Sequence, residues 1–254
     1  MNVVITGASS GIGEALALAC AQRGDRLFLC GRNRERLEAV ARRCREEGVM
    51  VAAETVDVAD EAAVRDWLLR CDATAPLERV FANAGVSTGV EDEANVRRTF
   101  AVNVGGCLNT ALPAIEIFRR RGGGQLLLTA SIAGYGPLAA CPAYSGGKAA
   151  VKTWGLALRG LLRREGIRVS VICPGFVRSR ITDRNTCPMP FFMEAPKAAR
   201  IILRRADRNV GLIAFPWPMR FASWFLSILP FRLNELIGAL LPPKVSRSEQ
   251  GKEV

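Results

Sequence analysis

Short apolar runs alternate with longer amphipathic stretches along the first 215 residues of the chain. The short runs are rich in Val, Ile, Leu and Phe and are bounded by turn-forming residues, as buried strands are. The longer stretches repeat apolar residues every three or four positions, as amphipathic helices do. Predicted strands cover residues 3–6, 26–30, 49–56, 79–82, 125–129, 167–173 and 210–215. This alternation indicates one α/β domain with a single doubly wound, parallel, seven-stranded sheet that is flanked by helices.

The segment after residue 215 has a different pattern, because large apolar and aromatic side chains fill residues 216–243 and a polar tail follows. Its longest apolar run is about a dozen residues, and a membrane span needs about 20. Pro230 interrupts that run, so we expect no transmembrane helix. Residues 216–254 are predicted to form an apolar helical extension of a catalytic domain at 1–215. Three roles stay open: a lid over a pocket, a subunit-packing arm, or a helix on a membrane surface with Arg220 and Arg232 near the headgroups.

The charge of the chain favours anionic partners. Its 254 residues carry a formal net charge of +11, which suits phosphorylated cofactors, acidic substrates or lipid headgroups. The alternative is that most arginines solvate helix faces. No basic run is interleaved with aromatic residues, so nucleic acid is not an expected partner.

Cysteine and histidine usage excludes several kinds of site. The eight cysteines are scattered singly, and the chain has no histidine. No zinc set can therefore be assembled, no metal is expected, and Ser-His and Cys-His nucleophiles are excluded. We expect a reduced cytoplasmic protein whose cysteines pack in the core. A strand already at residue 3 leaves no room for a signal peptide.

A glycine-rich turn separates the first predicted strand from the first predicted helix. Glycines let backbone N–H groups approach a phosphate, and the helix N-terminus adds positive partial charge. The residues of this predicted phosphate cradle are Gly7, Ser9, Ser10, Gly11, Ile12 and Gly13.

The end of the second strand indicates which dinucleotide is preferred. An acidic residue there would bind a ribose 2′-hydroxyl and repel a 2′-phosphate. This chain has Gly31 and then Arg32, and a guanidinium suits a phosphate. NADP(H) is therefore favoured over NAD(H). Arg34 and Arg36 lie nearby, with the alternative that they only begin an exposed helix.

Polar and glycine residues follow the other strands at the edge where ligands of parallel sheets bind. They are Asp57 and Val58, Asn83, Ala84 and Gly85, Ser131, and Pro174 and Gly175. One more polar residue, Asn103, interrupts the long helix predicted at 93–121. A buried asparagine within a helix bends it or binds a neighbouring backbone group.

Tyr144 and Lys148 lie four residues apart in a predicted helix at 143–162 and so share one face. A phenol has a pKa of about 10, and a cation beside it lowers that value towards working pH. A Tyr-x-x-x-Lys pair alone is more often an ordinary surface feature, so its context decides. Gly146 and Gly147 between them would admit a bulky substrate or a closer helix.

In this context the chain resembles the short-chain dehydrogenase/reductase family, in its single-domain branch of about 250 residues, over residues 1–215. The resemblance rests on the glycine turn, Asp57, the Asn83–Gly85 turn, Asn103, Ser131, the Tyr144/Lys148 pair and Pro174-Gly175, all in the family's order. It implies a Rossmann fold and hydride transfer between a nicotinamide and a carbonyl or secondary alcohol. In it, Tyr144 is the general acid/base, Ser131 positions the substrate oxygen, Lys148 lowers the phenol pKa, and Asn103 holds a water in a proton relay.

The resemblance also implies cofactor contacts. Asp57 and Val58 would meet adenine, residues 83–85 would pack along the cofactor, Tyr144 and Lys148 would face the nicotinamide ribose, and Pro174, Gly175 and Val177 would sit against the nicotinamide. Ser179 replaces a common Thr and would reach the carboxamide. A homodimer or homotetramer would form through the helices at 93–121 and 143–165.

Two rival functions remain beside the oxidoreductase. A sugar-nucleotide epimerase or dehydratase usually has Gly-x-x-Gly-x-x-Gly and a C-terminal substrate domain, and this chain has neither. A non-catalytic nucleotide sensor would typically lack the Tyr or the Lys. The apolar loop after Gly175 and the C-terminal segment favour a hydrophobic substrate, and peripheral membrane contact through 217–241 is one alternative for that segment.

Overall fold

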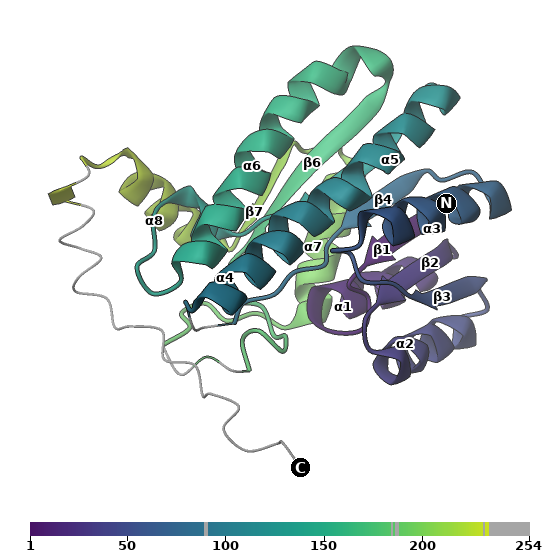
Figure 1. Ribbon diagram of the computed structural model, residues 1–254, viewed down its shortest axis with the longest axis horizontal. Coiled ribbons are helices and arrows are strands. Elements are labelled where there is room, and N and C mark those ends of the chain that lie inside the picture. The colour runs from purple at the N-terminus through teal and green to yellow at the C-terminus, as the bar shows by residue number, and fades with distance from the viewer. Residues whose placement is uncertain (89–90, 184, 186–187, 231, 234–254) are drawn as a thin grey trace.

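A computed structural model of the chain describes residues 1–88, 91–183, 185, 188–230 and 232–233. Seven parallel strands form one sheet in the order β3-β2-β1-β4-β5-β6-β7 (Figure 1). The strands are β1 (Asn2–Thr6), β2 (Arg26–Gly31), β3 (Val51–Thr55), β4 (Arg79–Ala82), β5 (Gly124–Thr129), β6 (Ile167–Pro174) and β7 (Leu212–Phe215). The predicted doubly wound α/β fold is confirmed, with strand ends shifted by one or two residues.

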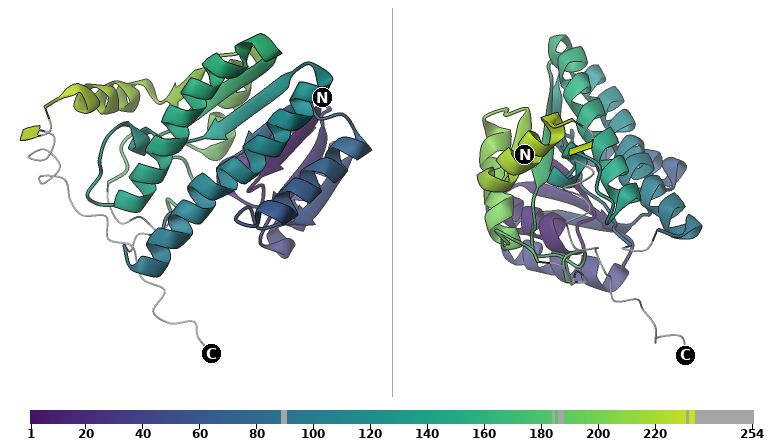
Figure 2. Two further views of the ribbon diagram at one scale, coloured as in Figure 1. Left: turned by 45° about the horizontal axis from the view of Figure 1, so that its top comes forward. Right: turned by 90° about the vertical axis from the view of Figure 1, so that its left-hand side faces the viewer.

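Helices cover both faces of the sheet, as the right-hand view of Figure 2 shows. On one face α1 packs between α2 and α7, and on the other α5 packs beside α3, and α4 beside α6. The helices are α1 (Gly11–Ala21), α2 (Arg34–Glu46), α3 (Glu61–Thr74), α4 (Glu93–Phe100), α5 (Gly106–Arg121), α6 (Pro142–Leu162), α7 (Ala195–Asp207) and α8 (Trp217–Ile228), with short turns η1 (Ala101–Gly105), η2 (Ile132–Tyr135) and η3 (Arg163–Glu165).

The strands build a separate hydrophobic core on each face of the sheet, because successive side chains point to opposite sides. Val4 and Phe28 are paired across β1 and β2 and pack into the core under α3 and α5. Val3 and Leu27 pack into the other core. All four are at most 3% exposed, and burial of each such side chain stabilises the fold by about 1.5–3 kcal/mol.

The cysteines behave as core residues. The side chains of Cys20, Cys30, Cys44, Cys71, Cys107, Cys141 and Cys173 are all buried. Burial raises the pKa of the Cys107 thiol to about 12, so this side chain is protonated at neutral pH. Cys187 lies outside the described residues.

The long helix predicted at 93–121 is interrupted by the π-helical turn η1, which separates α4 from α5. The turn contains Asn103, which is 1% exposed. Its amide accepts a hydrogen bond from Val86 N at 2.8 Å and donates one to Val86 O at 2.9 Å. The prediction that this asparagine binds a neighbouring backbone group is therefore confirmed.

The strand order places a functional edge beside β1 and β4. The chain leaves β1 towards β2 on one side and later returns to β4 on the other, so the loops after these strands diverge and leave a crevice. At the far end of the sheet α8 follows β7 and packs against η2 and β7. The predicted domain boundary at residue 215 coincides with the end of β7 and stays a prediction. Residues 231 and 234–254 of the predicted extension lie outside the described residues.

Candidate active site

A cavity of about 1360 Å³ runs along the carboxyl edge of the sheet from α2 to α8. Pockets for single small ligands are usually about 300–1,000 Å³. This cavity therefore has room for a dinucleotide and a second molecule.

The glycine turn between β1 and α1 forms the cavity's phosphate-sized cradle. Gly7 and Gly11 have φ of +67° and +60°, a left-handed conformation that favours glycine. A Cβ on Gly7 would lie 2.7 Å from Ala84 Cα, and one on Gly11 would lie 2.8 Å from Ser179 Cβ. Ser10 begins α1 without a side-chain cap. The N–H groups of the first turn can therefore bind an anion.

Thr6 joins this turn to the end of β4. Its Oγ1 accepts hydrogen bonds from Asn83 N at 3.0 Å and Ala84 N at 3.2 Å, while Asn83 Nδ2 donates to Thr6 O at 3.0 Å. The two strand ends that frame the crevice are thus held together by three hydrogen bonds.

The adenosine end of the cavity is lined by Gly31, Arg32 and Arg36, with Val56 and Val58 beyond them. A Cβ on Gly31 would lie 3.1 Å from Ser9 Oγ, so a side chain at position 31 would crowd the cradle. Asp57 is not among the residues that line the cavity, and its carboxylate accepts a hydrogen bond from Ala59 N at 3.0 Å, so its contact with adenine stays a prediction. Val56, which the sequence reasoning missed, lines the cavity instead.

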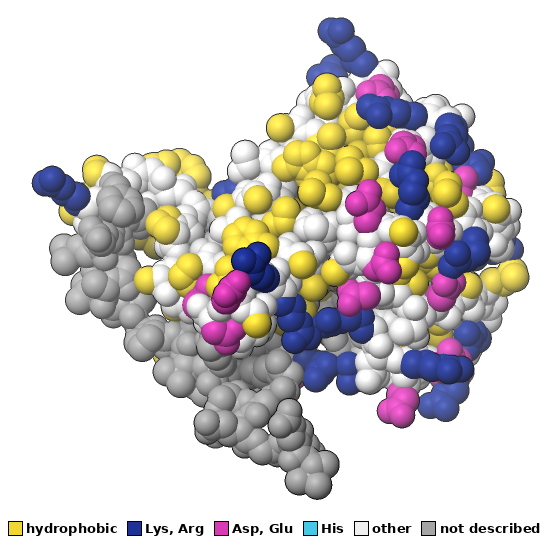
Figure 3. Space-filling model, in the orientation of Figure 1, with side chains coloured by type: hydrophobic (Ala, Val, Ile, Leu, Met, Phe, Trp, Pro, Cys, Tyr) yellow, Lys and Arg dark blue, Asp and Glu magenta, His cyan; other side chains and the backbone are white. Residues whose placement is uncertain are grey.

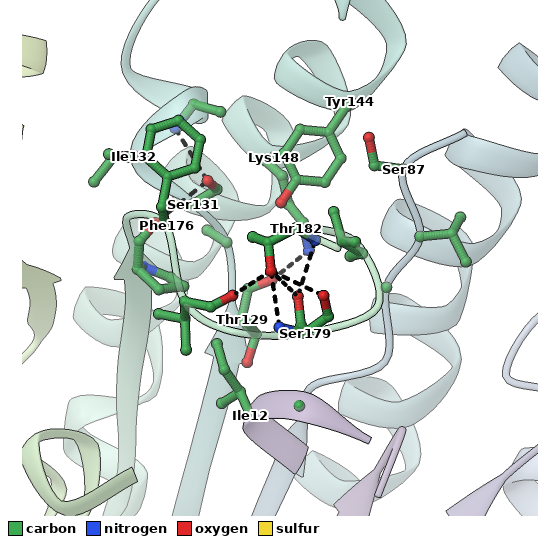
Figure 4. A pocket seen from close by; sticks show the side chains of 18 of the residues that line it. Ile12, Ser87, Thr129, Ser131, Ile132, Tyr144, Lys148, Phe176, Ser179 and Thr182 are labelled. Atoms are coloured by element: carbon green, nitrogen blue, oxygen red, sulfur yellow. Dashed lines mark hydrogen bonds between the residues drawn. The ribbon is translucent and has the colours of Figure 1, made fainter. Parts of the chain in front are cut away.

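Ser131, Tyr144 and Lys148 converge on the centre of the cavity (Figure 4). Tyr144 and Lys148 project from α6, and the Lys148 Nζ lies 5.8 Å from the centroid of the Tyr144 ring. Ser131 ends the segment after β5, where its Oγ accepts a hydrogen bond from Ala133 N at 3.1 Å and so begins η2. Lys148 Nζ donates to Thr129 O at 2.8 Å.

Burial dominates the protonation of this pair in the protein alone, and the predicted lowering of the phenol pKa by Lys148 stays a prediction. Burial raises the pKa of Tyr144 to about 12, and a hydrogen bond with Ser131 offsets the rise only in part. Burial also lowers the pKa of Lys148 to about 8. The charged forms of both groups are disfavoured because each loses its water. In the protein alone, Tyr144 therefore holds its proton through the whole physiological range.

Asn103 does not line the cavity, because both sides of its amide bind Val86. The residue therefore holds the segment after Gly85 in place, and its role in a proton relay stays a prediction. Gly85 is also confined, since a Cβ there would lie 3.1 Å from Asn103 Oδ1 and 3.2 Å from Lys148 Nζ. Glycine at this position keeps the Lys148 ammonium accessible from the cavity.

The loop after β6 lines the side of the cavity opposite Tyr144. Pro174, Gly175, Val177 and Ser179 are all lining residues, as expected. Ser179 is fixed by Thr182, whose Oγ1 accepts a hydrogen bond from Ser179 N at 2.8 Å. The sequence reasoning missed Thr182, although a hydroxyl three residues after Ser179 is a typical turn signal.

A second unpredicted contact fixes the start of α6. The Glu91 carboxylate accepts a hydrogen bond from Ala143 N at 3.1 Å, where a negative charge favours the helix N-terminus. The two residues are 52 positions apart, so no local pattern indicates the contact. A Cβ on Gly147 would make an ordinary contact with Val104 Cγ2 in η1, at 3.5 Å, so this approach of α6 to η1 does not require glycine.

Apolar residues close the remaining end of the cavity. They come from η2, the loop after β6 and one side of α8, and include Ile132, Leu138, Phe176, Phe191, Met219 and Leu226. Of the three roles predicted for the C-terminal segment, the lid role is the one that concerns this inner side of α8, which lines the cavity. Its other side is exposed and carries Trp217, Phe221, Trp224, Phe225 and Ile228.

Comparisons with known proteins agree with this geometry. Residues 1–188 match the family model described as short chain dehydrogenase. An uncharacterized oxidoreductase of Myxococcus xanthus is 36% identical over 234 residues, which cover 90% of this chain and 92% of that protein. An uncharacterized oxidoreductase of Mycobacterium tuberculosis is 29% identical, over 92% of this chain and 95% of that one.

Solved structures extend the likeness to the C-terminal part. A short-chain dehydrogenase from Sphingobium yanoikuyae in complex with NADPH superposes with a TM-score of 0.79 at 28% identity, covering 94% of this chain and 93% of that one. L-Sorbose reductase from Gluconobacter frateurii, complexed with NADPH and L-sorbose, gives 0.74 at 26% identity, covering 84% and 93%. The chain belongs to the short-chain dehydrogenase family and is an oxidoreductase of that family, whose members bind nicotinamide cofactors.

Proposed function

We propose that the protein is an NADP(H)-preferring oxidoreductase that interconverts a carbonyl and a secondary alcohol on a hydrophobic small molecule. The observation that carries the proposal is the convergence of Ser131, Tyr144 and Lys148 on the cavity that contains the glycine turn. The apolar closure of that cavity supports a hydrophobic substrate.

The cofactor, when bound, supplies or accepts the hydride. Tyr144 holds its proton because burial raises the pKa of the phenol to about 12, and so it is poised to donate that proton to a carbonyl oxygen. Ser131 Oγ is a second hydrogen-bonding group for the same oxygen. The Lys148 ammonium stabilises the phenolate that remains after the transfer. In the oxidative direction the phenolate takes the proton back from the alcohol.

The adenosine end supports a preference for the phosphorylated cofactor. The Gly31 backbone carries no acidic side chain that would repel a 2′-phosphate, and Arg32 and Arg36 line the cavity beside it. Two related proteins, from Sphingobium yanoikuyae and Gluconobacter frateurii, are found with NADPH. We expect NADPH to bind about tenfold more tightly than NADH, a difference of about 1.4 kcal/mol, and Arg32→Ala to remove most of it.

The catalytic assignment is tested by following NADPH oxidation over a panel of apolar ketones and aldehydes. Tyr144→Phe should abolish turnover while NADPH still binds, because the ring stays and only the phenol is lost. The chain has two tyrosines, and Tyr135 also lines the cavity. Tyr135→Phe is therefore a matched control that should keep its kcat. More than a few per cent of kcat in the Tyr144 variant, or equal losses in both variants, would contradict the assignment.

The same assay separates the rival functions. A nucleotide sensor would bind NADPH and turn over no member of the panel. An epimerase would convert a sugar nucleotide without net NADPH consumption.

Two surfaces support further contacts. Figure 3 shows hydrophobic side chains gathered over α5 and α6, where Leu112, Leu156 and Leu161 are exposed, and this face supports a homodimer or a tetramer of two dimers. The outer side of α8 is aromatic, and residues 208–234 contain three arginines and no acidic residue. This pattern supports peripheral contact with an anionic membrane surface.

A further inference from the structure

Helix α8, which lies wholly within the described residues, is rich in large apolar side chains, yet none of its residues is buried. Its exposed large side chains recur every three or four positions and therefore form one stripe along the helix. This outer stripe consists of Trp217, Arg220, Phe221, Trp224, Phe225 and Ile228. Packing within the fold does not account for the apolar composition of this stripe.

The rings of the outer stripe contact one another and form a continuous aromatic surface. The centroid of the Phe221 ring lies 5.8 Å from that of Trp224 and 6.5 Å from that of Phe225. Phe221 is 58% exposed, and Trp224 and Phe225 are each 48% exposed. Exposed apolar patches mark contact sites, and aromatic rings are favoured at the boundary between lipid headgroups and acyl chains.

The charge around the outer stripe complements an anionic lipid surface. Arg220 is an exposed member of the stripe, and the chain carries no acidic residue between Asp207 and Glu235. Basic and aromatic residues that share one helix are typical of helices that lie in the membrane interface. A second copy of the same segment would bring like charges together. Anionic phospholipid is therefore the partner that fits both the rings and the charge.

The opposite side of α8 lines the cavity that contains the candidate active site. This inner stripe consists of Pro218, Met219, Ala222, Ser223 and Leu226. It reaches the end of β6, since a Cβ on Gly175 would lie 3.0 Å from Met219 Sδ and 3.3 Å from Ile132 Cδ1, and Ile132 directly follows Ser131. An α-helix with its side chains is about 10–12 Å wide. Only the width of α8 therefore separates the outer stripe from the apolar end of the cavity.

We propose that the outer stripe of α8 lies on an anionic membrane surface and that the cavity takes its substrate, an apolar carbonyl or alcohol dissolved in the bilayer, directly from that surface. The inference rests on the proposed function and names the class and the source of its substrate. An interfacial helix buries its apolar face about 5–10 Å into the boundary between headgroups and acyl chains, which brings the apolar end of the cavity to the level of the headgroups. A lipid-soluble molecule then reaches the cavity beside α8 without crossing bulk water.

Sedimentation of the full chain with lipid vesicles tests the docking surface. Vesicles of phosphatidylcholine alone and vesicles that also contain phosphatidylglycerol are compared, and the unmodified protein should bind the anionic vesicles more tightly. Phe221→Ser should weaken this binding about tenfold, because one partly inserted ring is lost. Arg220→Gln should weaken it about fivefold, because one basic residue at the surface is lost. Leu69→Ser, which removes a 39% exposed apolar side chain from α3, is the control and should bind like the unmodified protein.

Light scattering without vesicles distinguishes a membrane from a second copy of the chain as the occupant of this surface. Phe221→Ser should keep the mass of the unmodified protein. A lower mass with unchanged vesicle binding would show that the outer stripe packs on a second copy, and the proposal would be wrong. An unmodified protein that does not bind anionic vesicles would refute it as well.

Delivery from the bilayer is tested by NADPH-dependent turnover of methyl butyl ketone in water and of methyl tridecyl ketone dissolved in anionic vesicles. Phe221→Ser should lower the rate with the long ketone about tenfold, in proportion to its loss of vesicle binding, and leave kcat/KM for the short ketone unchanged. Leu69→Ser should change neither value.

Three results would contradict delivery through α8: equal losses with both ketones, an unchanged rate with the long ketone although vesicle binding falls, or turnover of the short ketone alone by the unmodified protein. Failure of the proposed function has a different signature. If neither these ketones nor the panel of apolar ketones and aldehydes is turned over while vesicle binding responds as expected, the proposed activity and the delivery step are refuted and the docking surface stands.

Discussion

Replacement of Asn103 by alanine separates a structural role for this residue from a role in proton transfer. Its side chain is buried and forms two hydrogen bonds with Val86, at 2.8 and 2.9 Å. A residue that only held a relay water would be expendable for folding. A residue that holds the segment after β4 in place is needed for folding, because Asn103→Ala leaves the N–H and C=O groups of Val86 without this partner.

The size of the effect follows from these two bonds. Each buried polar group that loses its partner costs about 1–3 kcal/mol, so the variant should be destabilised by roughly 2–6 kcal/mol. For a domain of this size, 1 kcal/mol lowers Tm by about 2–4 °C. A loss of about 3 kcal/mol therefore predicts a fall of roughly 6–12 °C. The segment 83–88, which lines the cavity, should shift with it and weaken NADPH binding.

Thermal unfolding, NADPH binding and turnover are measured on the same preparations, at a temperature where the variant is fully folded. Asn109→Ala, in the adjoining helix α5, is the control, since its amide donates one hydrogen bond, to Val58 O at 2.9 Å, and is partly exposed. It should lose about 1 kcal/mol. A variant at position 103 that keeps its Tm and its NADPH affinity but loses kcat would refute the clamp and favour the relay.

Three further predictions concern the site and its surroundings. The reductive kcat/KM should fall as pH rises through about 8, because burial lowers the pKa of Lys148 to about 8 and the side chain is a neutral amine above that pH. A pH profile of kcat/KM that stays flat to about pH 10 contradicts this prediction. On α8, Met219→Ala on the inner side should raise KM and leave binding to vesicles of anionic phospholipid unchanged. Phe221→Ser on the outer side should weaken binding to these vesicles and leave KM unchanged. Leu156→Arg should convert the dimer to monomers in light-scattering measurements, and an unchanged mass would exclude this face as the interface.

The fold was accessible from the sequence because each of its elements carries its own local signal. Buried parallel strands are continuous apolar runs, and the glycine turn, the Gly122 helix end and Pro174 mark where elements stop. The long helix was harder to predict. A π-helical turn is a single turn with i→i+5 hydrogen bonds inside a continuing helix, and the pattern at 93–121 predicted one continuous helix where the structure has α4, η1 and α5.

The sequence predicted the candidate site only where a motif identifies an individual residue by its type and its place in the chain. The catalytic side chains and the glycine turn were located by their residue types and order. The pKa of Tyr144 was not, because the sequence shows the Lys148 cation four residues away and does not show that Lys148 is buried and that the phenol loses much of its water. Contacts between distant segments, such as Glu91 with Ala143 N, depend on tertiary structure and have no local pattern.

The positive charge of the chain illustrates the same limit in physical terms. From the sequence, a formal charge of +11 fits both an anionic ligand and solvated helix faces. The structure divides the arginines between these alternatives. Arg119 pairs with Glu165 and Arg121 with Asp72 on the surface, where each pair contributes little to stability. Arg32 and Arg36, by contrast, line the cavity beside Gly31, and neither forms an ion pair with a residue in the described part of the chain. A phosphate group bound beside these two guanidinium groups would be attracted by both charges, so the ligand reading of the positive charge applies to this part of the cavity and the solvation reading to the helix surfaces.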